Sequence, residues 1–177
     1  QYDRSLHHFL RALDIVDRHP ELWSPRAADI RLAMARMYVN SRDPARALDT
    51  LREVRSGHRR LPPRLEASAY FYEGRALVAQ DEIEPALLAF GRALELAHVH
   101  ELISIEANVL GNIANAHLKA GRYPQAEQAA RAALAPAERS EDRISLQMAK
   151  ANLGFALFGQ GRQREGMQQV DAVIATM

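Results

Sequence analysis

The sequence predicts an all-α protein, an α-solenoid of antiparallel helix hairpins that follow one another along the chain. Composition is the first reason: 47 % of the 177 residues are hydrophobic but only 6 % are aromatic, and the dominant alanine, leucine, arginine, glutamate and glutamine favour helix. Apolar residues also recur at helical spacing in most segments. Finally, the segments can be aligned on one another at a nearly constant offset, which indicates an internal repeat.

The first expected helix covers residues 2–19. Leu6, Phe9, Leu10, Leu13 and Val16 fall at the i, i+3, i+4, i+7 spacing of an amphipathic helix. Its register matches the second helix of a hairpin, so residues 1–19 form an orphan second helix whose partner is missing. We therefore expect the chain to be an excerpt of a longer protein, or its exposed terminal stripes to be covered by a second copy in a homodimer.

Four full repeats are expected after this helix. Ser24-Pro25 and Asp43-Pro44 each place an N-capping side chain before a proline at the first helical position. The repeats are assigned to residues 24–61, 63–99, 101–138 and 140–177. Equivalent positions lie 39, 40 and 40 residues apart, at Ala47, Ala86, Ala126 and Gly166.

The clearest copy runs from Glu106 to Ala133. It carries Leu110, Ile113-Ala114, His117, Gly121, Tyr123, Ala126 and Ala133. This spacing resembles the tetratricopeptide repeat, in which two short helices pack as an antiparallel hairpin. The resemblance implies a right-handed superhelix whose first helices line a concave face that binds a peptide or protein segment. The period of about 40 exceeds the ~34 residues of the common form, as in kinesin light chains, bacterial peptide-pheromone receptors and sensory regions of bacterial signalling proteins.

The resemblance also implies where a ligand would bind. Positions two, six and nine of the first helices supply the candidate groove residues Asp29, Arg36, Ser68, Tyr72, Arg75, Asn108, Asn112, Asn115, Asn152 and Phe155. Asparagine amides suit a peptide backbone, and an arginine can fork onto a carboxylate. The alternative stays open that the asparagines join neighbouring repeats and the arginines are only solvated. Because positions two and six hold no lysine, we do not expect the two-lysine carboxylate clamp of chaperone-binding members.

Other partners and chemistries are not expected. The formal net charge of +1 leaves no overall field to attract nucleic acid. No stretch is apolar over the ~18 residues that a membrane helix needs. The absence of cysteine fits a reducing compartment, so we expect a cytoplasmic location, with a periplasmic one left open. The run HELIS at residues 100–104 lacks the last histidine of a zinc motif. We expect no catalytic residues, no metal and no cofactor.

A narrower resemblance concerns the chain after Glu66. The runs GNIANAHLKAGRYPQAEQAARAAL and NLGFALFGQGRQREGMQQV are similar to the repeat region of bacterial diguanylate cyclases. The resemblance implies a sensory or oligomerisation region whose enzymatic GGDEF domain lies beyond the end of this sequence. Two alternatives remain: the regulatory domain of a transcription activator or peptide-pheromone receptor, and a stand-alone assembly scaffold.

Overall fold

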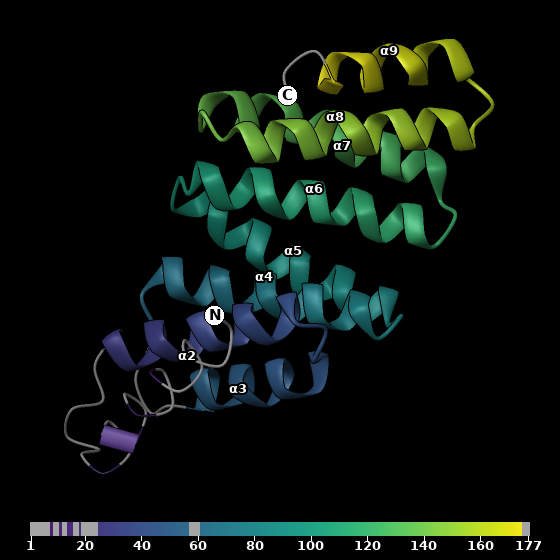
Figure 1. Ribbon diagram of the computed structural model, residues 1–177. Helices are drawn as coiled ribbons and strands as arrows, with labels where there is room; N and C mark the ends of the chain where they lie inside the picture. The colour runs from purple at the N-terminus through teal and green to yellow at the C-terminus, as the bar shows by residue number, and fades with distance from the viewer. Residues whose placement is uncertain are drawn as a thin grey trace.

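The computed structural model describes residues 8, 11, 14, 15, 18, 25–56 and 61–174, and every element in this part of the chain is a helix. The predicted all-α class is therefore confirmed (Figure 1). The helices are α2 (Pro25–Asn40), α3 (Pro44–Ser56), α4 (Pro63–Ala79), α5 (Ile83–Val99), α6 (Ile103–Lys119), α7 (Tyr123–Arg139), α8 (Arg143–Gly159) and α9 (Gln163–Ile174). Most of the predicted helix at residues 2–19 lies outside the described residues. None of the described helices is long and apolar enough to cross a membrane.

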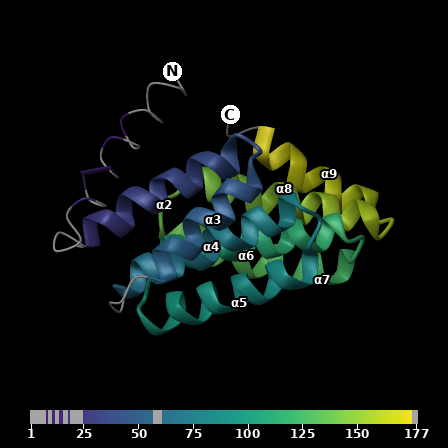
Figure 2. The ribbon, with the colours of Figure 1, turned by 90° about the horizontal axis from the view of Figure 1, so that it is seen from below.

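The helices form one curved stack of hairpins. Each helix packs against the next, and Figure 1 shows the stack from α3 at its lower end to α9 at its upper end. In addition α2 packs on α4, α4 on α6 and α6 on α8, whereas no comparable packing joins α3 to α5, α5 to α7 or α7 to α9 over the described residues. The even-numbered helices therefore lie on the inner side of the curve, and the odd-numbered helices spread apart on the outer side. Figure 2 shows the stack from below, with α2 at the left and α9 at the right. The assignment of these hairpins to the four residue ranges above stays a prediction.

Small residues set how closely the two helices of a hairpin approach. In the α4–α5 hairpin, a Cβ atom added to Gly74 would lie 2.5 Å from Cε1 of Phe90. The Phe90 side chain is fully buried, in a cluster with Val109 and Ala116 of α6. Gly74 therefore provides the space that one large ring fills, and that ring connects two hairpins.

The turns between the helices share one backbone conformation. Apart from the turn between α3 and α4, which is only partly described, each turn places a single residue in the left-handed region: Arg42, Asp81, Gly121 and Gly161 within hairpins, and Glu101 and Glu141 between them. At Asp81, its own N–H donates to the carbonyl of Val78 and the next N–H donates to that of Leu77, the Schellman motif of a helix end. The turns inside the hairpins are therefore alike whether or not they contain glycine.

Candidate functional site

The inner face of the stack is hollowed. A groove of about 760 Å³ crosses it, lined by residues of α2, α4, α6 and α8 together with the first residue of α7. We call this the central groove, lined by Val39, Arg75, Val78, Ala79, Asn112, Asn115, Leu118, Lys119, Tyr123, Phe155 and Gly159. It contains four of the predicted ligand residues, namely Arg75, Asn112, Asn115 and Phe155.

A smaller hollow lies between α2 and α4. This side pocket has a volume of about 250 Å³ and is lined by Asp29, Leu32, Ala33, Arg36, Arg64, Leu65, Ser68 and Tyr72. Four more predicted ligand residues, Asp29, Arg36, Ser68 and Tyr72, meet there. Eight of the ten candidate residues thus line one of two hollows on the inner helices.

The other two candidates, Asn108 and Asn152, line neither hollow. Asn152 is only 8 % exposed, and its Nδ2 donates to the carbonyl of Gly111, 2.8 Å away. Its amide therefore joins α8 to α6. Asn108 donates to the carbonyl of Ser104 in its own helix, at 2.8 Å. The structure thus gives both amides partners within the protein.

Arg75 is the cation at the centre of the groove. Its guanidinium lies 5.8 Å from the ring centroid of Phe71 and 6.0 Å from that of Tyr72, and Nη2 donates to the amide oxygen of Asn40 at 3.1 Å. No carboxylate is paired with it among the described residues. Burial lowers the pKa of Arg75, partly opposed by Tyr72, but an arginine stays protonated in proteins. The groove therefore holds a positive charge that the fold does not balance.

Lys119, the second cation of the groove, is in a different state. Its Nζ lies 2.5 Å from Oδ1 of Asp81 and donates to the carbonyl of Val78 at 2.7 Å. These bonds tie α6 to the end of α4. The charge of Lys119 is thus largely compensated by the protein itself.

An apolar shelf lies at the α8 side of the groove. Phe155 is 57 % exposed and Tyr123 is 36 % exposed. The Tyr123 ring is packed directly on Gly159, since a Cβ atom there would lie 2.2 Å from Cδ1 of the ring. Tyr123 was not among the predicted ligand residues because it begins a second helix, where the repeat pattern explains a tyrosine by packing alone.

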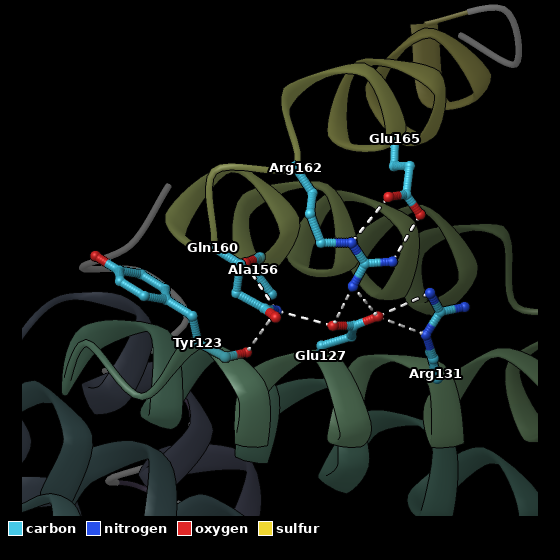
Figure 3. Close-up of polar contacts among 7 residues, drawn as sticks. All are labelled: Tyr123, Glu127, Arg131, Ala156, Gln160, Arg162 and Glu165. Atoms are coloured by element: carbon cyan, nitrogen blue, oxygen red, sulfur yellow. Dashed lines mark hydrogen bonds and ion pairs between the residues drawn. The ribbon is translucent and has the colours of Figure 1, made fainter.

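Polar contacts of Glu127 join the third hairpin to the fourth (Figure 3). Its carboxylate accepts hydrogen bonds from Gln160 at 2.8 Å, from Arg162 at 2.8 Å and from Arg131 of its own helix at 2.8 Å. Arg162 also pairs with Glu165 at 2.6 Å. The bond from Gln160, followed by those from the two arginines, lowers the pKa of Glu127 to about 2.

We predict that the stabilising contribution of Glu127 is lost in acid. Because its folded-state pKa is depressed, its contribution is complete above the unfolded value near 4.5 and is lost as pH falls toward 2. We expect roughly 1–2 kcal/mol from Glu127, after allowing for solvent screening of its half-exposed arginine partners. Urea unfolding of wild type and Glu127→Gln across this range measures it, and the two curves should converge near pH 2. The control is Glu138→Gln, on the exposed side of α7, whose stability should follow that of wild type at each pH. A difference between wild type and Glu127→Gln that does not change with pH would contradict the lowered pKa of Glu127.

Comparisons with known proteins agree on the architecture. Residues 107–140 match the family model of the tetratricopeptide repeat. A search of curated protein sequences gives no match. BtubC from P. vanneervenii is similar in structure over 100 % of this chain and 73 % of its own, with a TM-score of 0.76 and 16 % identity. Aspartyl phosphate phosphatase F from Bacillus subtilis is similar over 85 % of this chain and 40 % of its own, with a TM-score of 0.75 and 18 % identity.

A third similar structure contains the nearly identical TPR-like repeats of a putative kinesin light chain from Podospora anserina. It covers 99 % of this chain and 88 % of its own, with a TM-score of 0.73 and 15 % identity. At such identities the likeness establishes the fold, a solenoid of tetratricopeptide-like hairpins.

Proposed function

We propose that this chain, a tetratricopeptide-like repeat solenoid, is a non-catalytic module that binds a peptide or protein segment in its central groove. The observation that carries the proposal is the groove itself, which crosses all four described hairpins on their inner side. Amides, an unbalanced cation and exposed aromatic rings line one continuous hollow there. A long open groove of this composition suits an extended chain better than a compact small molecule.

The groove offers both kinds of contact that an extended peptide needs. Asn115 is exposed, and Asn112 uses one amide N–H on the carbonyl of Asn108. A primary amide has two donor hydrogens and two acceptor lone pairs, so both side chains retain capacity for a peptide backbone. Phe155 and Tyr123 provide the apolar surface on which a ligand side chain would rest.

Loss of the aromatic shelf tests this function. Peptides are selected from a phage-displayed random library on the wild-type chain, and their affinity is measured by fluorescence anisotropy. Phe155→Ala is expected to weaken binding about tenfold, since exposed aromatic residues in a groove act as anchors. The control is Leu88→Ala, which removes a 75 % exposed side chain from the outer helix α5 and should leave the affinity unchanged. Equal effects of the two substitutions, or no selected peptide, would contradict the proposal.

We infer a finer role from the resemblance of the region after Glu66 to bacterial diguanylate cyclases. On this proposal the module is the sensory or oligomerisation region of a larger signalling protein. A GGDEF segment in the reading frame beyond Met177 would support it, a DNA-binding segment would favour a transcription activator or pheromone receptor, and an early stop would favour an assembly scaffold.

A further proposal is that isolated copies of this chain dimerise through their terminal helices. Exposed Met167 and Ile174 on α9 support it, and analytical ultracentrifugation measures whether the chain sediments as a dimer.

A further inference from the structure

Many arginines in the described part of this solenoid are paired with carboxylates, among them Arg31, Arg52 and Arg131. Among the described residues the pairs that connect different helices include Arg55 with Glu73, Arg122 with Glu84 and Arg162 with Glu127. The half-buried Arg75 in the central groove has two aromatic rings and one amide oxygen instead. Neutral partners hold the guanidinium in position but leave its charge uncompensated, so the groove is prepared for an anionic group from a ligand.

The side pocket continues this cationic character. Tyr72 lines the side pocket and its ring also lies against Arg75, so the two hollows adjoin at this residue. The side pocket contains the exposed Arg36 and Arg64 against the single carboxylate of Asp29. Positive charge therefore extends from the middle of the inner face toward α2, while the apolar shelf lies toward α8.

We propose that the inner face binds an acidic peptide segment in one orientation. Its aspartate or glutamate side chains contact Arg75 and the side pocket, and an apolar side chain lies on the Phe155–Tyr123 shelf. This inference rests on the proposed function, whose ligand class it names. An internal acidic side chain is the favoured anion because the groove crosses the stack and adjoins the side pocket, so that a bound chain passes Arg75 rather than ending there. Partial burial makes the bond stronger than an exposed ion pair, since fewer water molecules screen it.

A nucleic acid is a less suitable ligand for the same charges. Phosphate groups would need several unpaired cations at regular intervals along the groove. Lys119 is already compensated by Asp81, and the net charge of the whole chain is only +1. The chemistry therefore favours a peptide with a few acidic residues over a polyanion.

The test uses the whole chain and the phage-displayed random library. Peptides selected on wild type are expected to be at least about twofold enriched in aspartate and glutamate over the input, with the acidic residues on one side of an apolar residue. For the best peptide, each acidic residue is replaced in turn by its amide. Replacing the residue that contacts Arg75 should weaken wild-type binding about tenfold, and should have little effect on Arg75→Gln, because that interaction is then already lost. Arg92→Gln is the matched control, since Arg92 is exposed on the outer helix α5 and pairs with Glu95.

These experiments distinguish acidic specificity from peptide binding in general. Selected peptides without acidic enrichment would overturn the acidic specificity and leave peptide binding intact. Amide effects of equal size in wild type and Arg75→Gln at every acidic position of the peptide would do the same. Failure to select any peptide would remove both. If Arg75→Gln does not fold, salt titration of wild type decides: added sodium chloride should weaken the glutamate peptide more than its glutamine form. Equal salt effects, or stronger binding of a single-stranded oligonucleotide, would also refute the inference.

Discussion

Replacing Gly74 by leucine is expected to lower the free energy of unfolding by about 3 kcal/mol, at the upper end of overpacking costs. A Cβ atom alone would lie 2.5–2.9 Å from three atoms of the Phe90 ring. That ring is fully buried in a cluster with residues of α6, so moving it aside would disturb the packing of the neighbouring hairpin. Urea unfolding followed by circular dichroism measures the change.

The neighbouring helix supplies a matched control. Gly91 is exposed on α5, and a Cβ atom there meets nothing within 4 Å. Gly91→Leu should therefore be neutral or slightly stabilising, because leucine has the higher helix propensity.

A double variant tests the same contact. Phe90→Ala alone should lower the free energy of unfolding by about 3–5 kcal/mol. The double variant Gly74→Leu/Phe90→Ala should lose less than the sum of the two single losses, since the leucine would partly fill the cavity. Additive costs would contradict the packing of α4 against α5.

The fold could be predicted from sequence because its determinants are local and repeated. Gly74 and Ala126 fall at the small positions of the repeat pattern, and both are buried in the structure. Asp81 occupies a turn position where the pattern has glycine, and the backbone there is left-handed, with φ of 63°. Helical spacing and turn residues thus determine each hairpin, and each hairpin buries its apolar side against its neighbours.

The candidate site was less predictable because it depends on how particular side chains meet between hairpins. The repeat positions identified Arg75, but they gave no sign that its neighbours would be rings and an amide rather than a carboxylate. Arg64 was not among the candidate groove residues, yet it lines the side pocket with Arg36. Pairing of charges across hairpins depends on helix crossing and side-chain reach, and neither follows from the spacing of residues along the chain.

The asparagines show this limit most clearly. Asn112 and Asn152 are equivalent residues of successive repeats, 40 positions apart, but Asn152 bonds to the α6 carbonyl of Gly111 and Asn112 bonds within its own helix. At Gly111 the terminal methyl of Met148 lies 2.5 Å from where a Cβ would be. The missing side chain lets α8 lie close enough for the Asn152 amide to reach the backbone. The position equivalent to Gly111 in the preceding repeat is Phe71, which carries a large ring packed against the buried cluster of Phe90 and Val109.

Asn152→Asp is accordingly expected to cost about 3 kcal/mol at pH 7, because it places an unpaired carboxylate against the Gly111 carbonyl in a buried site. Burial raises the pKa of the new carboxyl in the folded state, so that state binds the proton more tightly than the unfolded chain does. Relative to wild type, the variant should therefore regain stability as pH falls below the raised pKa, since a protonated carboxyl can donate to Gly111. Urea unfolding of both proteins at each pH measures the difference and removes the acid loss that they share.

The matched control for this effect is Asn115→Asp, on the same side of the inner layer but exposed in the central groove. It should change stability by less than about 0.5 kcal/mol, while weakening any acidic peptide through repulsion. The two substitutions make the same chemical change, so they separate an asparagine that holds hairpins together from one that is free to meet a ligand. If Asn152→Asp were as stable as wild type at neutral pH, its amide would not be the link between α6 and α8, and Asn152 would return to the set of candidate ligand residues.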